Sequence, residues 1–353
     1  MEYTELMCGL VCDAVFEGRQ NVPVPDMMKA VMYQFVKNRD AQYLIIGGYD
    51  HAITLGDARW HNTEPSGACR IYDPTSKGMW RALPERYPTS IYYHKSVNIG
   101  GGTILVTGGF DRTEFATEDC YTIDMYSERP TFEKVASMYM GRACHSIVRV
   151  NKVAVVVGGY TGDTRQLNSA EIYWPEFKRW ELKLDALPVP RHHHSACCIK
   201  DGILITGGII DFEMTATCLV YNPFKNTSTP VADMPMARGA HTSGRLKNGH
   251  VIVIGGYTNV HNAILECVIY DPDKNTWSIG PSIVNIRRNG ECISTPGGLV
   301  AFGGRTPDFG CVDKLIDGKW VESTDFLVGR AFWAFSCSGF LPNPATNTKF
   351  DVR

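Results

Sequence analysis

An all-β fold built from six repeats is what the sequence predicts, and two observations carry that prediction. Short apolar segments bounded by turn signals run through the chain with no helical period between them. Six glycine pairs each close an apolar segment, at separations of 61, 50, 49, 48 and 48 residues: Gly47-Gly48, Gly108-Gly109, Gly158-Gly159, Gly207-Gly208, Gly255-Gly256 and Gly303-Gly304. A period of about 50 residues marks a repeat architecture, and repeats of short antiparallel strands form the blades of a β-propeller.

The fifth repeat shows how one unit is predicted to fold. Residues 241–246 and 250–254 read as two strands joined by the turn signal at 247–249. A third strand is expected over 266–270, followed by a run of turn-forming residues, and a fourth begins at 276–278. The other repeats follow the same order, so we expect six blades, each a four-stranded antiparallel sheet.

The repeats share three sequence features: a glycine pair after an apolar strand, a Tyr-Asp-Pro-like turn further on, and an aromatic residue beyond that turn. The turn at 72–74 precedes Trp80, and the turn at 173–175 precedes Trp180. With these features the chain resembles kelch-repeat β-propellers over roughly residues 42–340. We expect the tryptophans to pack between blades, because a large aromatic ring fills the gap between twisted sheets.

Kelch rings often close with a strand from the C-terminus. Residues 329–337 resemble the first strand of a blade, but no glycine pair follows them, so we expect this strand to complete blade one. The chain then divides into an N-terminal arm (1–41, partly ordered, with a strand or a short helix), the propeller (42–340) and a C-terminal tail (341–353). A seven-bladed ring, its last blade shared between the two termini, is the alternative.

The overall charge excludes two classes of partner. A net charge of -2 gives no general attraction to nucleic acid or to an anionic membrane. The sequence shows no apolar stretch long enough to span a bilayer and no basic N-terminal segment followed by an apolar one. We therefore expect a soluble, cytoplasmic protein, with the nucleus as a second compartment.

The twelve cysteines are expected to be reduced and structural. Five of them occupy equivalent positions in five repeats: Cys69, Cys120, Cys218, Cys267 and Cys311. A small buried slot explains this repetition, because an unpaired cysteine behaves as a small apolar residue. Paired CxxC motifs with metal-ligand spacing are absent from the sequence, so we expect no metal and no cofactor.

Basic residues gather before the first strand of most blades. An arginine stands three residues before the leading position of that strand in five places: Arg142, Arg191, Arg238, Arg288 and Arg330. His192, His193 and Arg287 add to this set. One interpretation is a repeated structural bond to loop carbonyls. The other is a basic ring at the channel mouth that binds an acidic peptide, because the planar guanidinium group bonds carboxylates with two parallel hydrogen bonds.

The loop after the first glycine pair is longer than its counterparts. It has 20 residues between Gly48 and Cys69, against 9 or 10 in the next four blades. Long loops on a regular scaffold often carry recognition, so Tyr49, Arg59 and Trp60 are candidate partner-binding residues. Tyr257 follows its own glycine pair and is a further candidate for an aromatic rim.

The resemblance implies a non-catalytic platform that binds a peptide or loop of a partner protein through the face carrying these loops. Some kelch propellers bind actin, so an actin-like cytoskeletal protein is one expected partner and an acidic peptide is another. The residues before position 42 are too few for the N-terminal oligomerisation domain of ubiquitin-ligase adaptors. We therefore expect a stand-alone ring that serves as a subunit of a larger assembly.

An enzyme is the alternative function. Kelch propellers include sugar mutarotases or epimerases and copper-radical oxidases. A mutarotase needs an acid/base group beside arginines at the channel mouth, and Glu291 near Arg238 and His241 is the nearest candidate. The tyrosine, histidine and cysteine set of the oxidases cannot be placed in this sequence.

Overall fold

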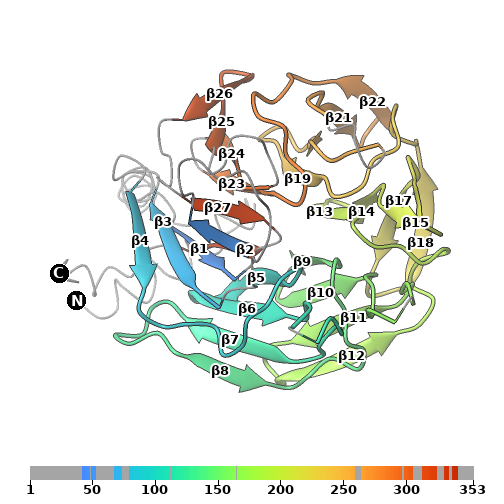
Figure 1. Ribbon diagram of the computed structural model, residues 1–353. Coiled ribbons are helices and arrows are strands. Elements are labelled where there is room, and N and C mark those ends of the chain that lie inside the picture. Colours follow the sequence, from blue (N-terminus) through green and yellow to red (C-terminus); the bar gives the residue numbers. More distant parts are fainter. Residues whose placement is uncertain are drawn as a thin grey trace, which may run out of the picture.

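A computed structural model describes eleven stretches of the chain: residues 42–47, 49–52, 67–73, 79–111, 113–163, 165–258, 264–295, 298–304, 312–323, 330–333 and 336–340. Within them every regular element is a β-strand, and six four-stranded antiparallel sheets stand around a common axis (Figure 1). The six-bladed propeller predicted from the sequence is confirmed, and the seven-bladed alternative is wrong. No helix of the described residues is long and apolar enough to cross a membrane.

Each blade runs from an inner strand at the axis to an outer strand at the rim. The inner strands, which contact one another around the axis, are β28 (Ser336–Phe340), β5 (Lys95–Gly100), β9 (Ser146–Val150), β13 (Ser195–Ile199), β19 (Thr242–Arg245) and β23 (Glu291–Thr295). The second strands are β1 (Gln42–Ile46), β6 (Thr103–Thr107), β10 (Val153–Val157), β14 (Gly202–Thr206), β20 (Val251–Ile254) and β24 (Gly298–Phe302).

The outer half of each blade is built in the same way. The third strands are β3 (Cys69–Asp73), β7 (Cys120–Asp124), β11 (Ala170–Trp174), β17 (Cys218–Asn222), β21 (Val268–Asp271) and β25 (Val312–Ile316). The outer strands are β4 (Met79–Leu83), β8 (Phe132–Val135), β12 (Arg179–Lys183), β18 (Thr227–Val231), β22 (Thr276–Ile279) and β26 (Lys319–Ser323). In the fifth blade these bounds match the predicted strands to within two residues.

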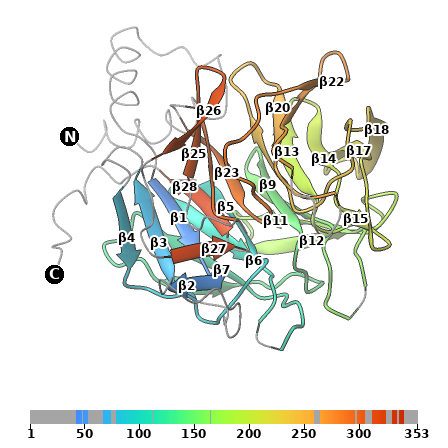
Figure 2. The same cartoon turned by 45° about the horizontal axis from the view of Figure 1, so that its top comes forward.

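Blade one is closed by the C-terminal strand β28, as expected, but further along the chain than residues 329–337. Ser336 faces Ile46 in the β28–β1 ladder, as Ser146 faces Val157 in blade three, so the inner strand begins at Ser336. The residues before it form β27 (Arg330–Trp333), which pairs with β2 (Tyr49–Ala52) in a separate two-stranded ribbon (Figure 2). A second ribbon, β15 (Ile209–Ile210) with β16 (Glu213–Met214), follows the glycine pair of blade four.

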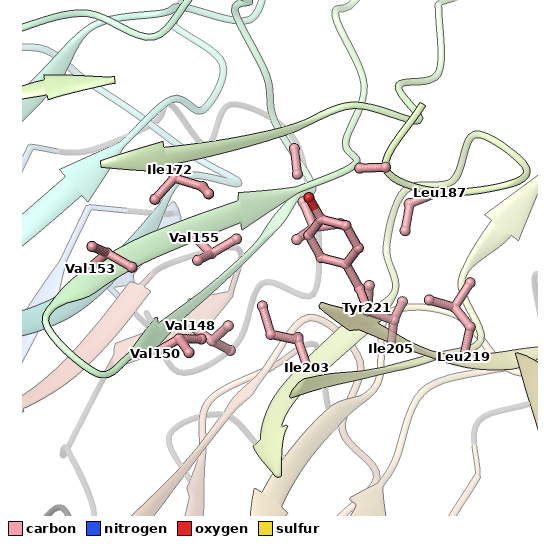
Figure 3. Close-up of a cluster of buried hydrophobic side chains, with 13 residues drawn as sticks. Val148, Val150, Val153, Val155, Ile172, Leu187, Ile203, Ile205, Leu219 and Tyr221 are labelled. Carbon is pink, nitrogen blue, oxygen red and sulfur yellow. The ribbon is translucent and has the colours of Figure 1, made fainter. Parts of the chain in front are cut away.

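The core lies between neighbouring blades rather than at one centre. Figure 3 shows the cluster between blades three and four, where Val155 and Ile172 meet Ile203, Leu219 and Tyr221. The second strands are covered on both faces, which explains why they read as continuous apolar runs in the sequence. In β10 all five residues are buried.

The first glycine of a pair has no room for a side chain. In blade two, Gly108 has a φ of +57°, and a Cβ there would lie 2.1 Å from the carbonyl oxygen of Arg142 in blade three. Glycine adopts this left-handed backbone without the steric penalty that other residues meet. The repeated glycines are therefore explained by close approach of one blade to the next.

The predicted structural roles of tryptophan and cysteine are confirmed where the structure describes them. Trp180 and Trp277 each donate an indole N–H to a carbonyl of the preceding blade, at 2.8 Å to Ala136 and 2.7 Å to Ala232. The four described repeat-position cysteines are buried and unpaired, and burial raises the pKa of each thiol to about 12: Cys69, Cys120, Cys218 and Cys267. Such thiols are protonated and unreactive at neutral pH.

Candidate protein-binding face

Two sets of loops meet on one side of the ring. The first set joins the second to the third strand of a blade, and the second set joins the outer strand of one blade to the inner strand of the next. Isolated antiparallel bridges join the two sets in four blades: Tyr92 with Phe110, Ala143 with Tyr160, His192 with Ile209, and Gly239 with Tyr257. We call this side the loop face; its described parts lie within 47–68, 84–94, 108–119, 136–145, 158–169, 184–194, 207–217, 232–241, 255–267, 280–290 and 303–304.

Four arginines of the loop face are buried and bonded within the protein. Each donates from Nη1 to the carbonyl oxygen of the first glycine in its own blade: Arg142 to Gly158 (2.8 Å), Arg191 to Gly207 (3.0 Å), Arg238 to Gly255 (3.2 Å) and Arg287 to Gly303 (2.7 Å). The backbone carbonyl of each arginine accepts from the second glycine of the preceding blade, for example from Gly109 to Arg142 at 2.8 Å. Each arginine therefore ties two blades together.

The expectation of an open basic ring does not hold for these four side chains. Their exposed fractions are 0% for Arg142 and Arg238, 1% for Arg287 and 2% for Arg191. A partner would have no access to the guanidinium groups. The geometry matches the other interpretation of the sequence, a repeated bond to loop carbonyls.

Arg287, and not Arg288, holds the repeat position in blade six. Arg287 makes the same bond to its glycine pair as Arg142 does, and Gly290 stands where blade three has His145. The sequence has two adjacent arginines here, and the prediction that Arg288 holds the repeat position is wrong. Arg288 is partly exposed, with its guanidinium carbon 5.7 Å from the ring centre of Tyr257.

Two of the buried arginines have buried acidic partners. Arg142 donates to Glu171 at 2.7 Å, and Arg287 donates to Asp313 at 3.0 Å. Glu171 also accepts backbone N–H bonds from Tyr139 (2.7 Å) and Met140 (3.1 Å), so its carboxylate takes part in three hydrogen bonds. Burial lowers the pKa of the Arg142 guanidinium, and Glu171 opposes this effect. These pairs are internal supports of blades three and six.

Four histidines lie behind the arginines and are also internal. They are buried at equivalent positions: His94, His145, His194 and His241. His145 bonds Thr107 of the preceding blade at 2.9 Å through Nε2, and His241 bonds Thr206 in the same way at 2.9 Å. Burial lowers the pKa of His94 and of His241 to about 3, so these rings are neutral at physiological pH.

A belt of backbone hydrogen bonds links blades two to six at the mouth of the channel. Its members are the non-glycine residues with φ between 53° and 57° that stand just before the buried histidine position: Tyr93, Cys144, His193, Ala240 and Asn289. In the last four of these residues the N–H donates to the carbonyl of the equivalent residue one blade back, at 3.0 Å from Cys144 to Tyr93, 2.9 Å from His193 to Cys144, 2.8 Å from Ala240 to His193 and 2.9 Å from Asn289 to Ala240. The belt fixes the side chains at the mouth on a rigid frame.

Aromatic rings cover part of this belt. Tyr93 packs edge-on against Phe110 and against His193, with ring centres 6.3 and 5.2 Å apart. Phe110 meets Tyr160 at 6.3 Å, and Tyr160 meets His192 at 5.2 Å. The candidate residues His192 and His193 therefore come together with aromatic rings over blades two to four, largely by packing against them. Burial lowers the pKa of His192 to about 4 and of His193 to about 3, so neither supplies positive charge at neutral pH.

A small cavity of about 40 Å³ lies at the mouth, lined in part by Tyr93, His193, Lys95 and Glu291. Lys95 and Glu291 form an ion pair there and are 28% and 17% exposed. Glu291, the candidate acid/base group of the enzyme alternative, thus has lysine as its partner rather than Arg238. Among the described residues no cluster of three or more histidine, cysteine, aspartate or glutamate side chains could hold a metal ion.

The remaining candidate residues belong to the long first loop and to β27. Arg59 and Trp60 lie outside the described residues, as do the N-terminal arm and the C-terminal tail. Tyr49 and Arg330 lie in the β2–β27 ribbon, where they face Trp333 and Ala52 respectively. Their role in partner binding stays a prediction.

Exposed apolar side chains on the loop face were missed from the sequence. Of thirteen large hydrophobic residues that are exposed among those described, eight lie on this face: Phe115, Tyr139, Leu184, Val189, Phe212, Met236, Leu265 and Val284. Phe212 is the most exposed, at 81%. Some of these residues recur with the repeat, because Tyr139 and Val284 each stand three residues before the buried arginine of their blade, and Val189 and Met236 each stand two residues before theirs. Phe212 lies outside the repeat, but it could have been found from its place between two acidic residues in a short hairpin.

Residues 93–304 match the family described as the KLHDC2/KLHL20/DRC7 Kelch-repeats domain. This match covers more than half of the chain, including blades two to five and the inner half of blade six.

Curated relatives are similar at low identity. Kelch-like protein 23 of Homo sapiens is 25% identical over 241 residues, which is 67% of this chain and 41% of that protein. Alpha-scruin of Limulus polyphemus is 27% identical over 208 residues, 52% of this chain and 22% of that protein. Kelch repeat and BTB domain-containing protein 12 of Homo sapiens is 24% identical over 266 residues, 67% of this chain and 40% of that protein. The chain thus spans at most about two fifths of the length of these relatives.

Proposed function

Because the chain belongs to the kelch-repeat family, we propose that it is a non-catalytic platform that binds a protein partner through its loop face and works as a subunit of the resulting assembly. The observation that carries this proposal is the set of exposed apolar side chains on that face. Exposed apolar patches on a folded protein often mark interaction sites. The loops that present them are fixed by the arginine bonds and the backbone belt, and recognition residues commonly sit on loops held by a rigid scaffold.

The partner proposed from the sequence needs one revision. An acidic peptide was expected because the arginines were expected to be open to solvent, and four of them are buried. The proposal therefore depends on apolar contact and on the remaining exposed groups of the loop face. A cytoskeletal partner stays within the proposal, since it makes no demand on the buried arginines.

A pair of matched variants tests the proposed face. The first carries Phe115→Ser, Tyr139→Ser and Phe212→Ser on the loop face, and the control carries Phe177→Ser and Phe224→Ser in turns between third and outer strands, on the other side of each blade. Affinity purification from the native cell, with quantitative mass spectrometry, should show partners lost from the first variant and kept by the control. Equal loss from both, or no loss from either when both are folded, would refute the loop face as the binding surface.

A further inference from the structure

The loop face over blades two to four combines exposed phenylalanines with an excess of carboxylates. Resting on the proposed function, we infer that this part of the face binds a basic protein segment that also presents apolar surface. We call it the ridge; it consists of the described residues within 110–117, 160–167 and 209–215.

The three loops of the ridge form one continuous surface. Ala116 of blade two donates its backbone N–H to the carbonyl of Thr161 in blade three at 3.1 Å. With the side-chain amide of Gln166 in blade three turned so that both of its groups are satisfied, it donates to the carbonyl of Ile209 in blade four at 3.2 Å and accepts from the N–H of Asp211 at 3.1 Å. A bound segment can therefore contact all three blades without crossing a gap.

Phe212 is presented at the tip of a strained hairpin. β15 and β16 are joined by Asp211 and Phe212, whose φ angles are +48° and +69°. Positive φ at both central residues is the signature of a type I′ turn, which favours asparagine and glycine. Phenylalanine is disfavoured here by the backbone and, with 81% of its surface exposed, by water as well. Contact with an apolar surface of a partner would explain why this side chain stands at this position.

Both exposed phenylalanines of the ridge have carboxylates next to them in the sequence. Asp211 and Glu213 flank Phe212, and Glu114 precedes Phe115; all three acids are exposed. The described ridge has five acidic residues, Asp111, Glu114, Asp163, Asp211 and Glu213, and one basic residue, Arg165, which pairs with Asp163 at 3.2 Å. With Arg112, which lies outside the described residues, the sequence of these loops has five acids and two arginines.

The negative charge of the ridge favours a partner segment with positive charge. The whole chain has a net charge of -2, so the ridge is more acidic than its size alone would give. Oppositely charged rims around an apolar centre steer association and reject like-charged partners. Lysine or arginine around an apolar pocket would pair with Asp211 and Glu213 while the pocket takes the ring of Phe212. An acidic peptide, a nucleic acid and an anionic membrane would each meet repulsion at the same place.

The test uses a random 12-residue peptide library displayed on phage and selected on the immobilised full chain. Enriched peptides are then synthesised, and their affinity for wild type is measured by fluorescence anisotropy at low and high salt. We expect a net positive charge with at least one large apolar residue, and binding that weakens as salt rises. The apolar variant Phe115→Ser/Phe212→Ser should weaken binding at least tenfold, and the charge variant Asp211→Asn/Glu213→Gln several-fold. The control Phe177→Ser/Phe224→Ser should leave binding unchanged.

The outcomes separate this inference from the proposed function. Peptides that are neutral or acidic but still depend on Phe115 and Phe212 would overturn the basic partner and leave the loop face as the binding surface. Peptides whose affinity is the same for wild type and for both ridge variants would refute the ridge as the binding site, and would count against the loop face as well. A selection that enriches no peptide above the blank surface would overturn the inference, because a ridge of this chemistry should capture some sequence of that length.

Discussion

Lys95 and Glu291 join blade two to blade six by an ion pair that passes the mouth of blade one. They hold the same position, the first residue of the inner strand, where blades three, four and five have Ser146, Ser195 and Thr242. Beside this pair, Asn289 donates from Nδ2 to the hydroxyl of Tyr93 at 3.2 Å, between the same two blades. Blade one is the blade completed by β28 from the far end of the chain, so these contacts span the blade in which strand pairing between β28 and β1 closes the ring.

Removing either charge of this pair should weaken ring closure. We expect Lys95→Met and Glu291→Gln each to lower the free energy of unfolding by about 1 kcal/mol, since the pair is partly buried. The double variant should lose less than the sum, because the two changes remove one shared contact. Urea denaturation of the four proteins checks this. Lys134→Met removes an exposed surface pair with Asp119 and serves as the control, and strictly additive losses would contradict the bridge.

The buried carboxylate of Glu171 should be more costly to remove. Glu171→Gln leaves the guanidinium of Arg142 buried without its counter-charge, and breaking a buried pair in this way costs about 3–5 kcal/mol. Denaturant unfolding followed by tryptophan fluorescence measures the loss. Glu181→Gln, in the next strand of the same blade, removes a partly exposed acid and should cost under about 1 kcal/mol. A loss below that value for Glu171→Gln would show that the arginine finds another acceptor.

Stability should fall as the pH drops below the ordinary range of histidine. Burial lowers the folded-state pKa of His94 and His241 to about 3, and that of His194 well below its usual value of 6.5. The unfolded chain binds protons first, so the stabilisation is complete above about pH 6.5 and is lost as pH falls toward about 3. Each such group contributes about 1.4 kcal/mol per pH unit within that window.

One substitution isolates a single histidine in this pH dependence. The ring nitrogens of His194 have no hydrogen-bond partner, and its ring packs against Gly158, so His194→Phe removes the titration while keeping a ring. Thermal unfolding between pH 7.5 and 4.5 should then show a slope smaller by about one proton than in wild type. An unchanged slope would mean that His194 is not neutral in the folded protein.

Phe212→Gly should change stability and binding in opposite directions. Glycine relieves the positive φ of this turn position, which costs other residues about 1–2 kcal/mol, and the flexibility of glycine offsets part of that gain. We expect the midpoint of thermal unfolding to rise or stay level while affinity for the selected basic peptides falls. Phe224→Gly, at another exposed turn without a positive φ, should be slightly destabilising and leave affinity unchanged. If the Phe212→Gly variant is clearly less stable than wild type, the positive φ of Phe212 does not strain the turn.

The architecture could be predicted because steric needs repeat with the blades. Gly108 and its counterparts are required by backbone contact between neighbouring blades, and doubly covered strands such as β10 must be apolar, so both leave regular marks in the sequence. Whether the arginine side chains are buried or exposed could not be predicted in the same way. The sequence shows an arginine at position 142 whether its guanidinium group is buried or exposed. Its direction depends on the carbonyl oxygen of Gly158, which lies 16 residues further along the chain. Phe212 was missed because it occurs once, outside the repeat.

The backbone belt at the mouth links the motion of one blade to that of its neighbours. Cys144 donates to the blade before it and accepts from the blade after it, and so do His193 and Ala240. A fluctuation that loosens one of these blades must break two links at once, so local opening is penalised from both sides. Amide deuterium exchange at these three positions should therefore be slow and nearly uniform, and the propeller should present its partner with a surface that keeps its shape before binding.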